Sequence, residues 1–327
     1  MRLPRAIVAA LVLSTSALAF ADSAAAADPV TVRIDWLYTS YHAPFFLGLE
    51  KGWYRDAGIE LAIKEGRGSG NVVQLVGNGS DAFGFAGADA VVRGVQQGVP
   101  VVSVATIMPR NADVLLVLAS SGIAKVGDLK GKRIGSTPGG TSDALLPAFL
   151  RGAGLAPGDV TIVPIDAQLK PQMVLQGRVD AMNAPAWGRS FLASGGEVRA
   201  FAYADNGVEV VGYTIVASAD TVKSQPDLVS RFVAATLKSW AYAVEHPDET
   251  LAAIVKHVPE TFTPERRANA RADLVEALKL VKPAVAGRPL GAQSEADWER
   301  MQKQLADYGV IRQTRPVDQY LTHRFVR

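Results

Sequence analysis

Four ring-bearing side chains crowd one short stretch of the sequence, between an apolar run at 30–34 and a helix start at Pro44. They are Trp36, Tyr38, Tyr41 and His42. The faces of such rings stack on other planar groups, and their polar edges form hydrogen bonds. Core packing is the alternative, and we favour it for Phe45 and Phe46, which share one face of the following helix. For the four residues of the loop we favour contact with a planar ligand.

Three glycine-containing turns precede other expected helices, at 68–71, 87–89 and 139–142. The candidate ligand contacts in them are Gly68, Ser69, Asn71, Asp89, Gly139, Gly140, Thr141 and Ser142. The first N–H groups of a helix are unpaired, so such turns can bind anions and ring carbonyls, and glycine lets the backbone approach closely. In the alternative, the glycines serve turn geometry alone, while Ser69 and Asp89 are plain helix caps. No turn has the lysine spacing of a P-loop.

Three more candidates lie in the second half of the sequence: Asn183, Trp187 and Tyr213. Asn183 and Trp187 follow the apolar run 179–183, and ligands of open α/β proteins bind at the carboxyl ends of strands. We expect Trp187 to form the wall of an aromatic clamp opposite the first loop. Tyr213 lies in the run 208–217, which is expected to return the chain from one domain to the other.

Catalytic and metal-binding patterns are not evident. The sequence has no cysteine, which excludes disulfides, thiol catalysis and cysteine metal sites. A lone histidine such as His42 is more often structural than a metal ligand. With 34 basic and 32 acidic side chains, the formal net charge of +2 gives no reason to expect a nucleic-acid partner. We therefore expect a binding protein without cofactor or metal, rather than an enzyme.

Strand and helix patterns alternate from residue 30 onward, which predicts an α/β fold with largely parallel sheets. A chain of 327 residues exceeds the usual size of one domain, and no flexible linker separates its parts. We expect two lobes, residues 28–115 with 215–327 and residues 116–214. The chain should cross between them near 113–119 and again near 208–217.

The first 27 residues have the pattern of a secretory signal peptide. Two arginines precede a short apolar run, and small residues lead to a cleavage position before Asp28, or alternatively before Asp22. The apolar run is shorter than the about 20 residues that a membrane span needs. We expect an exported protein, which in a Gram-negative cell means the periplasm.

Several segments together resemble the substrate-binding proteins of ABC importers. They are IDWLYTSYHAPFFLGLEKGWYRDAGIEL, GNGSDAFGFAGADAVVRG, VGDLKGKRIGSTPGGTSDALLPAFL, LQGRVDAMNAPAW and PDLVSRFVAATLKSWAYAVEHPDET. The group that they resemble binds thiamine-pyrimidine precursors, aliphatic sulfonates, taurine and nitrate. The resemblance implies a two-lobed periplasmic binding protein of the type II kind, with two crossover hinge strands and a ligand cleft between the lobes. It also implies a monomer that delivers a small molecule to a membrane permease.

Two ligand classes remain open within this resemblance. Trp36 and His42 stand where the pyrimidine-binding branch has its tryptophan and histidine, but Tyr38 and Thr39 replace its usual Pro-Asn. A planar heterocycle would stack on the aromatic residues, whereas a small oxyanion would rest on the turns at 68–71 and 139–142. A related eukaryotic group is a pyrimidine synthase that uses pyridoxal phosphate and a cysteine cluster, which this sequence lacks. A secreted sensor is the remaining alternative.

Overall fold

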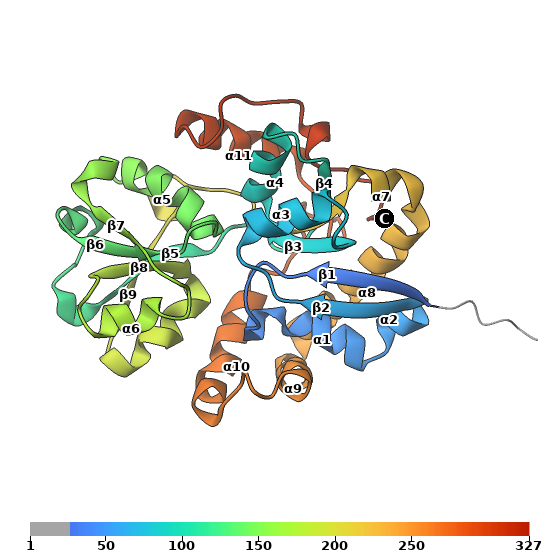
Figure 1. The fold of residues 1–327 in the computed structure, drawn as a ribbon, viewed down its shortest axis with the longest axis horizontal. Helices are drawn as coiled ribbons and strands as arrows, with labels where there is room; N and C mark the ends of the chain where they lie inside the picture. Colours follow the sequence, from blue (N-terminus) through green and yellow to red (C-terminus); the bar gives the residue numbers. More distant parts are fainter. Residues whose placement is uncertain (1–26, 327) are drawn as a thin grey trace, which may run out of the picture.

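The computed structural model describes residues 27–326 and places them in two lobes, each built on a five-stranded sheet covered by helices (Figure 1). The expected signal peptide lies outside the described residues, apart from residue 27. Within residues 27–326, no helix is both long and apolar enough to cross a membrane.

The sheet of the first lobe has the strand order β2-β1-β3-β10-β4. Its strands are β1 (Asp28–Arg33), β2 (Ile59–Lys64), β3 (Phe83–Gly87), β4 (Val101–Thr106) and β10 (Tyr213–Ser218). The first three pair in parallel, and β10 runs antiparallel to both of its neighbours. β3 is buried along its whole length, as expected of a central strand with helices on both faces.

The sheet of the second lobe repeats this arrangement in the order β7-β6-β8-β5-β9. Its strands are β5 (Asp113–Leu118), β6 (Arg133–Ser136), β7 (Thr161–Pro164), β8 (Ala181–Pro185) and β9 (Val198–Ala202). Here β5 is the antiparallel strand. In each sheet, therefore, the antiparallel strand is the first one formed after the chain has crossed from the other lobe.

Helices cover both sheets. The helices of the first lobe are α1 (Ala43–Glu50), α2 (Trp53–Asp56), α3 (Ser69–Gly77), α4 (Ala88–Gln96), α7 (Ala219–Ser224), α8 (Pro226–Glu245), α9 (Pro247–His257) and α10 (Pro264–Leu278). Of these, α9 and α10 pack on other helices of the lobe. The second lobe carries α5 (Thr141–Gly152), α6 (Lys170–Leu175) and the 3-10 segment η5 (Ala186–Gly195). Buried aromatic pairs join the layers: Phe83 of β3 stacks on Phe232 of α8 with ring centroids 3.9 Å apart. Phe45 belongs to this core as well, as expected.

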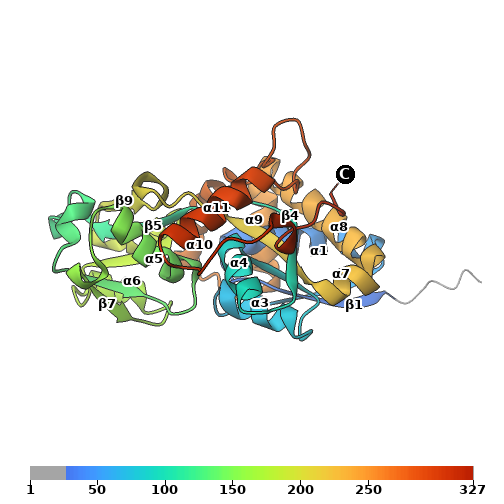
Figure 2. The same ribbon diagram turned by 90° about the horizontal axis from the view of Figure 1, so that it is seen from above.

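The chain crosses between the sheets at 107–112 and 203–212. These segments contact each other, because Asn111 N–H donates to the carbonyl of Val210 at 3.0 Å. A Cβ on Gly212 would lie only 2.4 Å from the Arg110 carbonyl oxygen, so this close approach requires glycine. The first crossing thus precedes β5, whereas the sequence had placed it at 113–119, within this strand. The second crossing overlaps the expected range 208–217 at residues 208–212 and ends where β10 begins. The helix α11 (Glu295–Asp307) lies against α4 beside the junction of the lobes (Figure 2).

Candidate ligand-binding site

A cavity of about 850 Å³ lies between the lobes. Its walls come from the loops that follow β1, β2, β6 and β8, together with α6, η5 and α10. Eleven of the candidates from the sequence line it: Trp36, Tyr38, Tyr41, Gly68, Ser69, Gly140, Thr141, Ser142, Asn183, Trp187 and Tyr213. The carboxyl ends of strands from both sheets therefore meet at one cavity.

Four candidates do not line this cavity. His42 and Asp89 are fully buried behind its wall. Asn71 is exposed on α3 and does not belong to the cavity lining. Gly139 is exposed too, and its carbonyl packs against Gly68, where a Cβ would lie 2.4 Å away.

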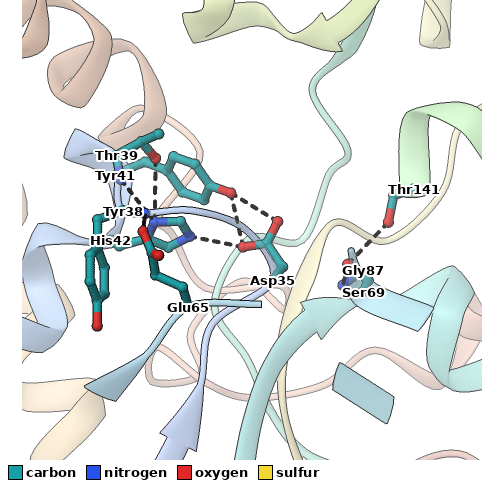
Figure 3. Close-up of polar contacts among 9 residues, drawn as sticks. All are labelled: Asp35, Tyr38, Thr39, Tyr41, His42, Glu65, Ser69, Gly87 and Thr141. Carbon is teal, nitrogen blue, oxygen red and sulfur yellow. Dashed lines mark hydrogen bonds and ion pairs between the residues drawn. The ribbon is translucent and has the colours of Figure 1, made fainter. Parts of the chain in front are cut away.

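Asp35, directly after β1, is the polar centre of the first-lobe wall (Figure 3). Its carboxylate accepts hydrogen bonds from the hydroxyl of Tyr41 at 2.8 and 2.9 Å and from Nε2 of His42 at 2.9 Å. Burial and the neighbouring Asp35 carboxylate hold the pKa of Tyr41 well above its ordinary value, so the phenol stays a neutral donor. These bonds fix a carboxylate in the cavity wall, where its remaining lone pairs can accept a bond from a ligand.

His42 acts through Asp35. His42 Nδ1 lies 3.4 Å from the backbone nitrogen and 3.3 Å from the hydroxyl of Thr39, and Nε2 lies 2.9 Å from Oδ1 of Asp35. Both ring nitrogens are thereby occupied. A direct hydrogen bond from His42 to a ligand, as the sequence had suggested, has no donor or acceptor left to make it, and we assign His42 to positioning the carboxylate.

Tyr38 is anchored to its own lobe. Its backbone N–H donates to Oε1 of Glu65 at 2.6 Å, its hydroxyl donates to the carbonyl of Ile63 at 2.8 Å, and its ring packs edge-on against Phe46. Figure 3 shows the ring directed away from Asp35. Glu65 lines the cavity and was not singled out from the sequence, because its role depends on β1 and β2 being neighbours.

The aromatic contact across the cleft joins Tyr41 and Trp187, whose ring centroids are 4.8 Å apart. A ring held between two others needs contact distances of about 3.5 Å on each face, so no ligand ring fits between these two. Trp36 lies elsewhere in the wall, half-buried, with Cζ3 3.8 Å from where a Cβ of Gly140 would be. Of the two tryptophans in the cavity lining, Trp187 packs against Tyr41 and Tyr213, whereas no ring of the described residues pairs with Trp36.

The two turns that could have held an oxyanion contact each other. Thr141 Oγ1 donates to Ser69 Oγ at 3.3 Å, and Ser69 Oγ accepts from the N–H of Gly87 at 3.0 Å (Figure 3). Neither hydroxyl caps its helix; the N-cap residues of α3, α4 and α5 are the glycines before them, Gly68, Gly87 and Gly140. The expected caps at Ser69 and Asp89 were therefore wrong. The Ser69 and Thr141 hydroxyls join the lobes instead, and Asp89 pairs with Arg93 of its own helix.

Asp89 and Asp113 are buried carboxylates on the hinge side of the cleft, behind the cavity wall. Asp89 forms a 2.8 Å ion pair with Arg93, and Asp113 accepts a hydrogen bond from Ser142. Each keeps one oxygen that has no hydrogen-bond partner in the described part of the chain. Burial, with a smaller contribution from the charge of Asp89, raises the pKa of Asp113 to about 6. Asp113 thus favours the protonated form in mildly acidic solution.

The C-terminal part of the first lobe closes the mouth of the cavity. α10 and the loop before it contribute Glu260, Phe262, Arg266, Asn269 and Asp273 to the lining. Ser190 of η5 donates to Oδ2 of Asp273 at 2.5 Å, a second polar link between the lobes. Burial raises the pKa of Asp273 to about 6. Local sequence gave no signal for these residues, since α10 reaches the cleft only through the packing of α8 and α9.

Carboxyl groups outnumber cations in the lining. The acidic members are Asp35, Glu65, Asp143, Glu260 and Asp273, and the basic ones are Lys170 and Arg266. An anionic ligand entering this cavity meets like charge, whereas a neutral or cationic ligand with N–H groups meets hydrogen-bond acceptors. Among residues 27–326, no group of three or more acidic, histidine or cysteine side chains is placed to hold a metal ion.

Residues 39–250 match the family described as NMT1/THI5 like. This chain belongs to the NMT1/THI5-like family. Its two-lobed α/β architecture is the periplasmic binding protein fold, as the sequence predicted.

Two curated relatives of this NMT1/THI5-like protein have different functions in their names. The 4-amino-5-hydroxymethyl-2-methylpyrimidine phosphate synthase THI12 of Saccharomyces cerevisiae is 30% identical over 155 residues, which are 47% of this chain and 45% of the yeast protein. The chain thus matches less than half the length of that relative. The riboflavin-binding protein RibY of Chloroflexus aurantiacus is 27% identical over 308 residues, 91% of this chain and 86% of that protein.

Among solved structures, the alkanesulfonate-binding protein SsuA from Xanthomonas axonopodis pv. citri, bound to MOPS, has a TM-score of 0.71. The superposition covers 91% of this chain and all of the other, at 18% identity. At this identity the likeness shows the fold and carries no information on the ligand of the NMT1/THI5-like chain.

Proposed function

We propose that this protein is the solute-binding component of an ABC importer and that it captures a planar nitrogen heterocycle. The excess of carboxyl groups over cations in the cavity lining carries this proposal. Carboxylates accept hydrogen bonds from amino groups and ring N–H groups, and the available face of Trp36 supplies stacking. The alternative ligand, a small sulfonate or nitrate, would bring negative charge into an acidic cavity. The turns expected to hold it are joined by the Ser69–Thr141 bond.

The size of the cavity bears on which heterocycle is bound. A volume of about 850 Å³ lies in the upper part of the range for drug-sized ligands, about 300–1,000 Å³. A single pyrimidine ring, such as a thiamine precursor, occupies a fraction of it. A three-ring flavin fills more of it, and the relative RibY, named for riboflavin binding, aligns with most of this chain. We therefore propose two candidate ligands within the class of planar nitrogen heterocycles: a pyrimidine precursor and a flavin-sized ring system.

Delivery to a permease and export to the periplasm complete the proposal. One structural neighbour is named as the ligand-binding component of an ABC-type import system and another as a periplasmic sulphonate-binding protein. The first 27 residues have the composition of a signal peptide. We propose transport without catalysis, as a monomer. N-terminal sequencing of protein from a periplasmic extract should give a chain that starts at Asp28 or, if the upstream position is used, at Asp22. Full-length protein retained in the membrane fraction would contradict export.

The ligand class is tested by calorimetric titration of the protein after denaturation and refolding, which removes any bound ligand. The probes are 4-amino-5-hydroxymethyl-2-methylpyrimidine, riboflavin, and MOPS as a sulfonate. We expect saturable one-to-one binding of at least one ring compound and none of MOPS. Tight binding of MOPS with no binding of either ring would overturn the proposal in favour of the sulfonate alternative.

A further inference from the structure

Lys170 is the buried cation of the cavity. It is the first residue of α6, its exposed fraction is 9%, and it lies in the cavity lining. Its Nζ donates to the backbone carbonyl of Asn183 at 2.7 Å and to Oδ1 of the same residue at 3.0 Å. Arg266, the other cation of the lining, is exposed on α10 at the mouth. Lys170 is therefore the positive group that a ligand inside the cavity meets.

An ammonium group carries three N–H donors, and Asn183 takes two of those of Lys170. Burying a charged group is costly unless hydrogen bonds compensate it, so the third donor calls for a partner. Within residues 27–326 the structure gives Nζ only the two bonds to Asn183. Because Lys170 belongs to the cavity lining, a bound molecule can supply the missing acceptor there.

The ammonium group is held rigidly in place. Asn183 Nδ2 donates to Ser136 Oγ at 2.6 Å, and Ser136 Oγ donates to Oδ1 of Asp143, also at 2.6 Å. This chain of bonds ties β8, β6 and α5 together around Lys170. The rigidity matters for recognition, because a donor with a fixed direction discriminates between ligands more sharply than a mobile one.

We propose that Lys170 determines ligand specificity by donating its third hydrogen bond to an acceptor on the heterocycle, either a ring carbonyl or an unprotonated ring nitrogen. This inference rests on the function proposed above and narrows it. The bound ring presents an acceptor to Lys170 on the second lobe and N–H groups to the carboxylates on the first, Asp35 and Glu65. A ring with donors on both edges, or a plain hydrocarbon ring, does not satisfy both walls.

The test compares the parent with Lys170→Met, which keeps the length of the side chain and removes its charge and donors. The probes are riboflavin, 4-amino-5-hydroxymethyl-2-methylpyrimidine, and the benzene isostere of the latter, in which C–H replaces both ring nitrogens. For each ring compound that the parent binds, Lys170→Met should bind about tenfold to a hundredfold more weakly. Affinity for the isostere should be low in the parent and unchanged in the variant. Lys238→Met, on the exposed face of α8, is the matched control and should change nothing.

A pH profile distinguishes recognition from a merely structural role. Burial lowers the pKa of Lys170 to about 8, while the charged groups that act on it, Asp113 on β5 and Asp143 on α5, favour its protonated form. A bound acceptor also favours this form, so affinity should fall as pH rises from about 7 to about 9. Carboxyl groups ordinarily titrate below this range. The affinity of Lys170→Met should not fall over this pH range. Lys170→Arg should bind the ring compound, and its affinity should not fall either, since the guanidinium group stays charged over the same range.

The outcomes separate this inference from the proposed function. If the parent binds MOPS and neither ring compound, the proposed function itself is wrong. If the parent binds one of them and Lys170→Met binds it equally tightly with the same pH profile, the assignment of Lys170 is wrong and the function stands. If Lys170→Met does not fold, as judged by circular dichroism, Lys170→Arg decides the question. A fall in affinity near pH 8 that persists in Lys170→Arg contradicts the inference.

Discussion

Tyr41 of the first lobe and Trp187 of the second lobe contact each other across the cleft, with ring centroids 4.8 Å apart and planes inclined by 44°. Both rings are buried, and Tyr41 also donates to Asp35. The pair belongs to the cavity lining and links the lobes there. It does not form a clamp with space for a ligand, which leaves Trp36 as the tryptophan on which a planar molecule can stack.

Replacing Trp36 by alanine should weaken ligand binding about tenfold to several hundredfold. The loss combines stacking, about 0.5–1.5 kcal/mol, with apolar area removed from water at roughly 25 cal/mol per Å². Each 1.4 kcal/mol corresponds to about tenfold in affinity. Trp36→Phe should lose much less, because it keeps a flat face. Calorimetric titration with the ring compound that the parent binds measures these differences.

The matched control for Trp36 is Trp53→Ala. Trp53 is half-buried like Trp36, but it belongs to α2 and packs on Tyr242, outside the cavity. Its loss should leave affinity unchanged. If Trp36→Ala binds as tightly as the parent, while circular dichroism shows both to be folded, Trp36 does not stack on the ligand.

Gly87→Ala should hinder closure of the lobes. The backbone of Gly87 is compatible with alanine, since its φ is −61°. The added Cβ, however, would lie 2.5 Å from Oγ1 of Thr141 on the other lobe and 2.6 Å from Oδ1 of Asp89. We expect a larger radius of gyration in small-angle scattering at saturating ligand, and weaker binding. Gly127→Ala, where a Cβ meets nothing within 4 Å, should behave like the parent. Unchanged scattering and affinity for Gly87→Ala would show that this contact plays no part in closure.

Asp113 should make folding stability depend on pH in a direction unusual for a carboxyl group. Its pKa is raised to about 6 in the folded protein, so between about pH 4 and pH 6 the folded state binds more protons than the unfolded one. Stability from this group is fully present below about pH 4 and is lost as pH rises through about 6. Asp113→Asn removes the titrating group, so the variant should not undergo this decrease in the free energy of unfolding, which is roughly 2–3 kcal/mol in the parent. The variant should therefore gain stability relative to the parent between about pH 4 and about pH 7.5 in chemical denaturation.

Asp128→Asn is the control of opposite sign. Hydrogen bonds from the backbone N–H groups of Ala124 and Lys125 lower the pKa of Asp128, so its stabilising effect is present at neutral pH and disappears in acid. This variant should lose stability relative to the parent at about pH 7.5 and lose less at acidic pH. If Asp113→Asn gave the same pattern as Asp128→Asn, the carboxyl of Asp113 would not be penalised by burial.

Much of the fold was predictable because its signals are local. The alternation of apolar strands with glycine-terminated helices predicted the α/β class, and the apolar run expected at 30–34 corresponds closely to β1 (Asp28–Arg33). The aromatic loop at 36–42 was likewise visible, since its residues are consecutive. The strand expected at 208–217 begins only at Tyr213, because the preceding residues cross between lobes and pair with the other crossing segment.

The remainder of the site depends on contacts between distant segments. Asp35 matters because Tyr41 and His42 fold back onto it, and Lys170 because Asn183 lies beside it in space. The turns at Ser69 and Thr141 looked like two separate anion sites in the sequence, yet in the structure they bind each other. A charged or hydroxyl side chain gives no sign in the sequence of whether its partner will be a ligand or another part of the chain.

The identity of the natural ligand tests the central claim most directly. Protein purified from the periplasm without denaturation should be unfolded in acid, and the molecules released should be analysed by mass spectrometry and ultraviolet absorption. We predict close to one equivalent of a heterocycle that absorbs in the near ultraviolet and carries both an N–H group and a ring acceptor. Release of a sulfonate or another small oxyanion in that amount would contradict the claim, as would a ligand without a planar ring.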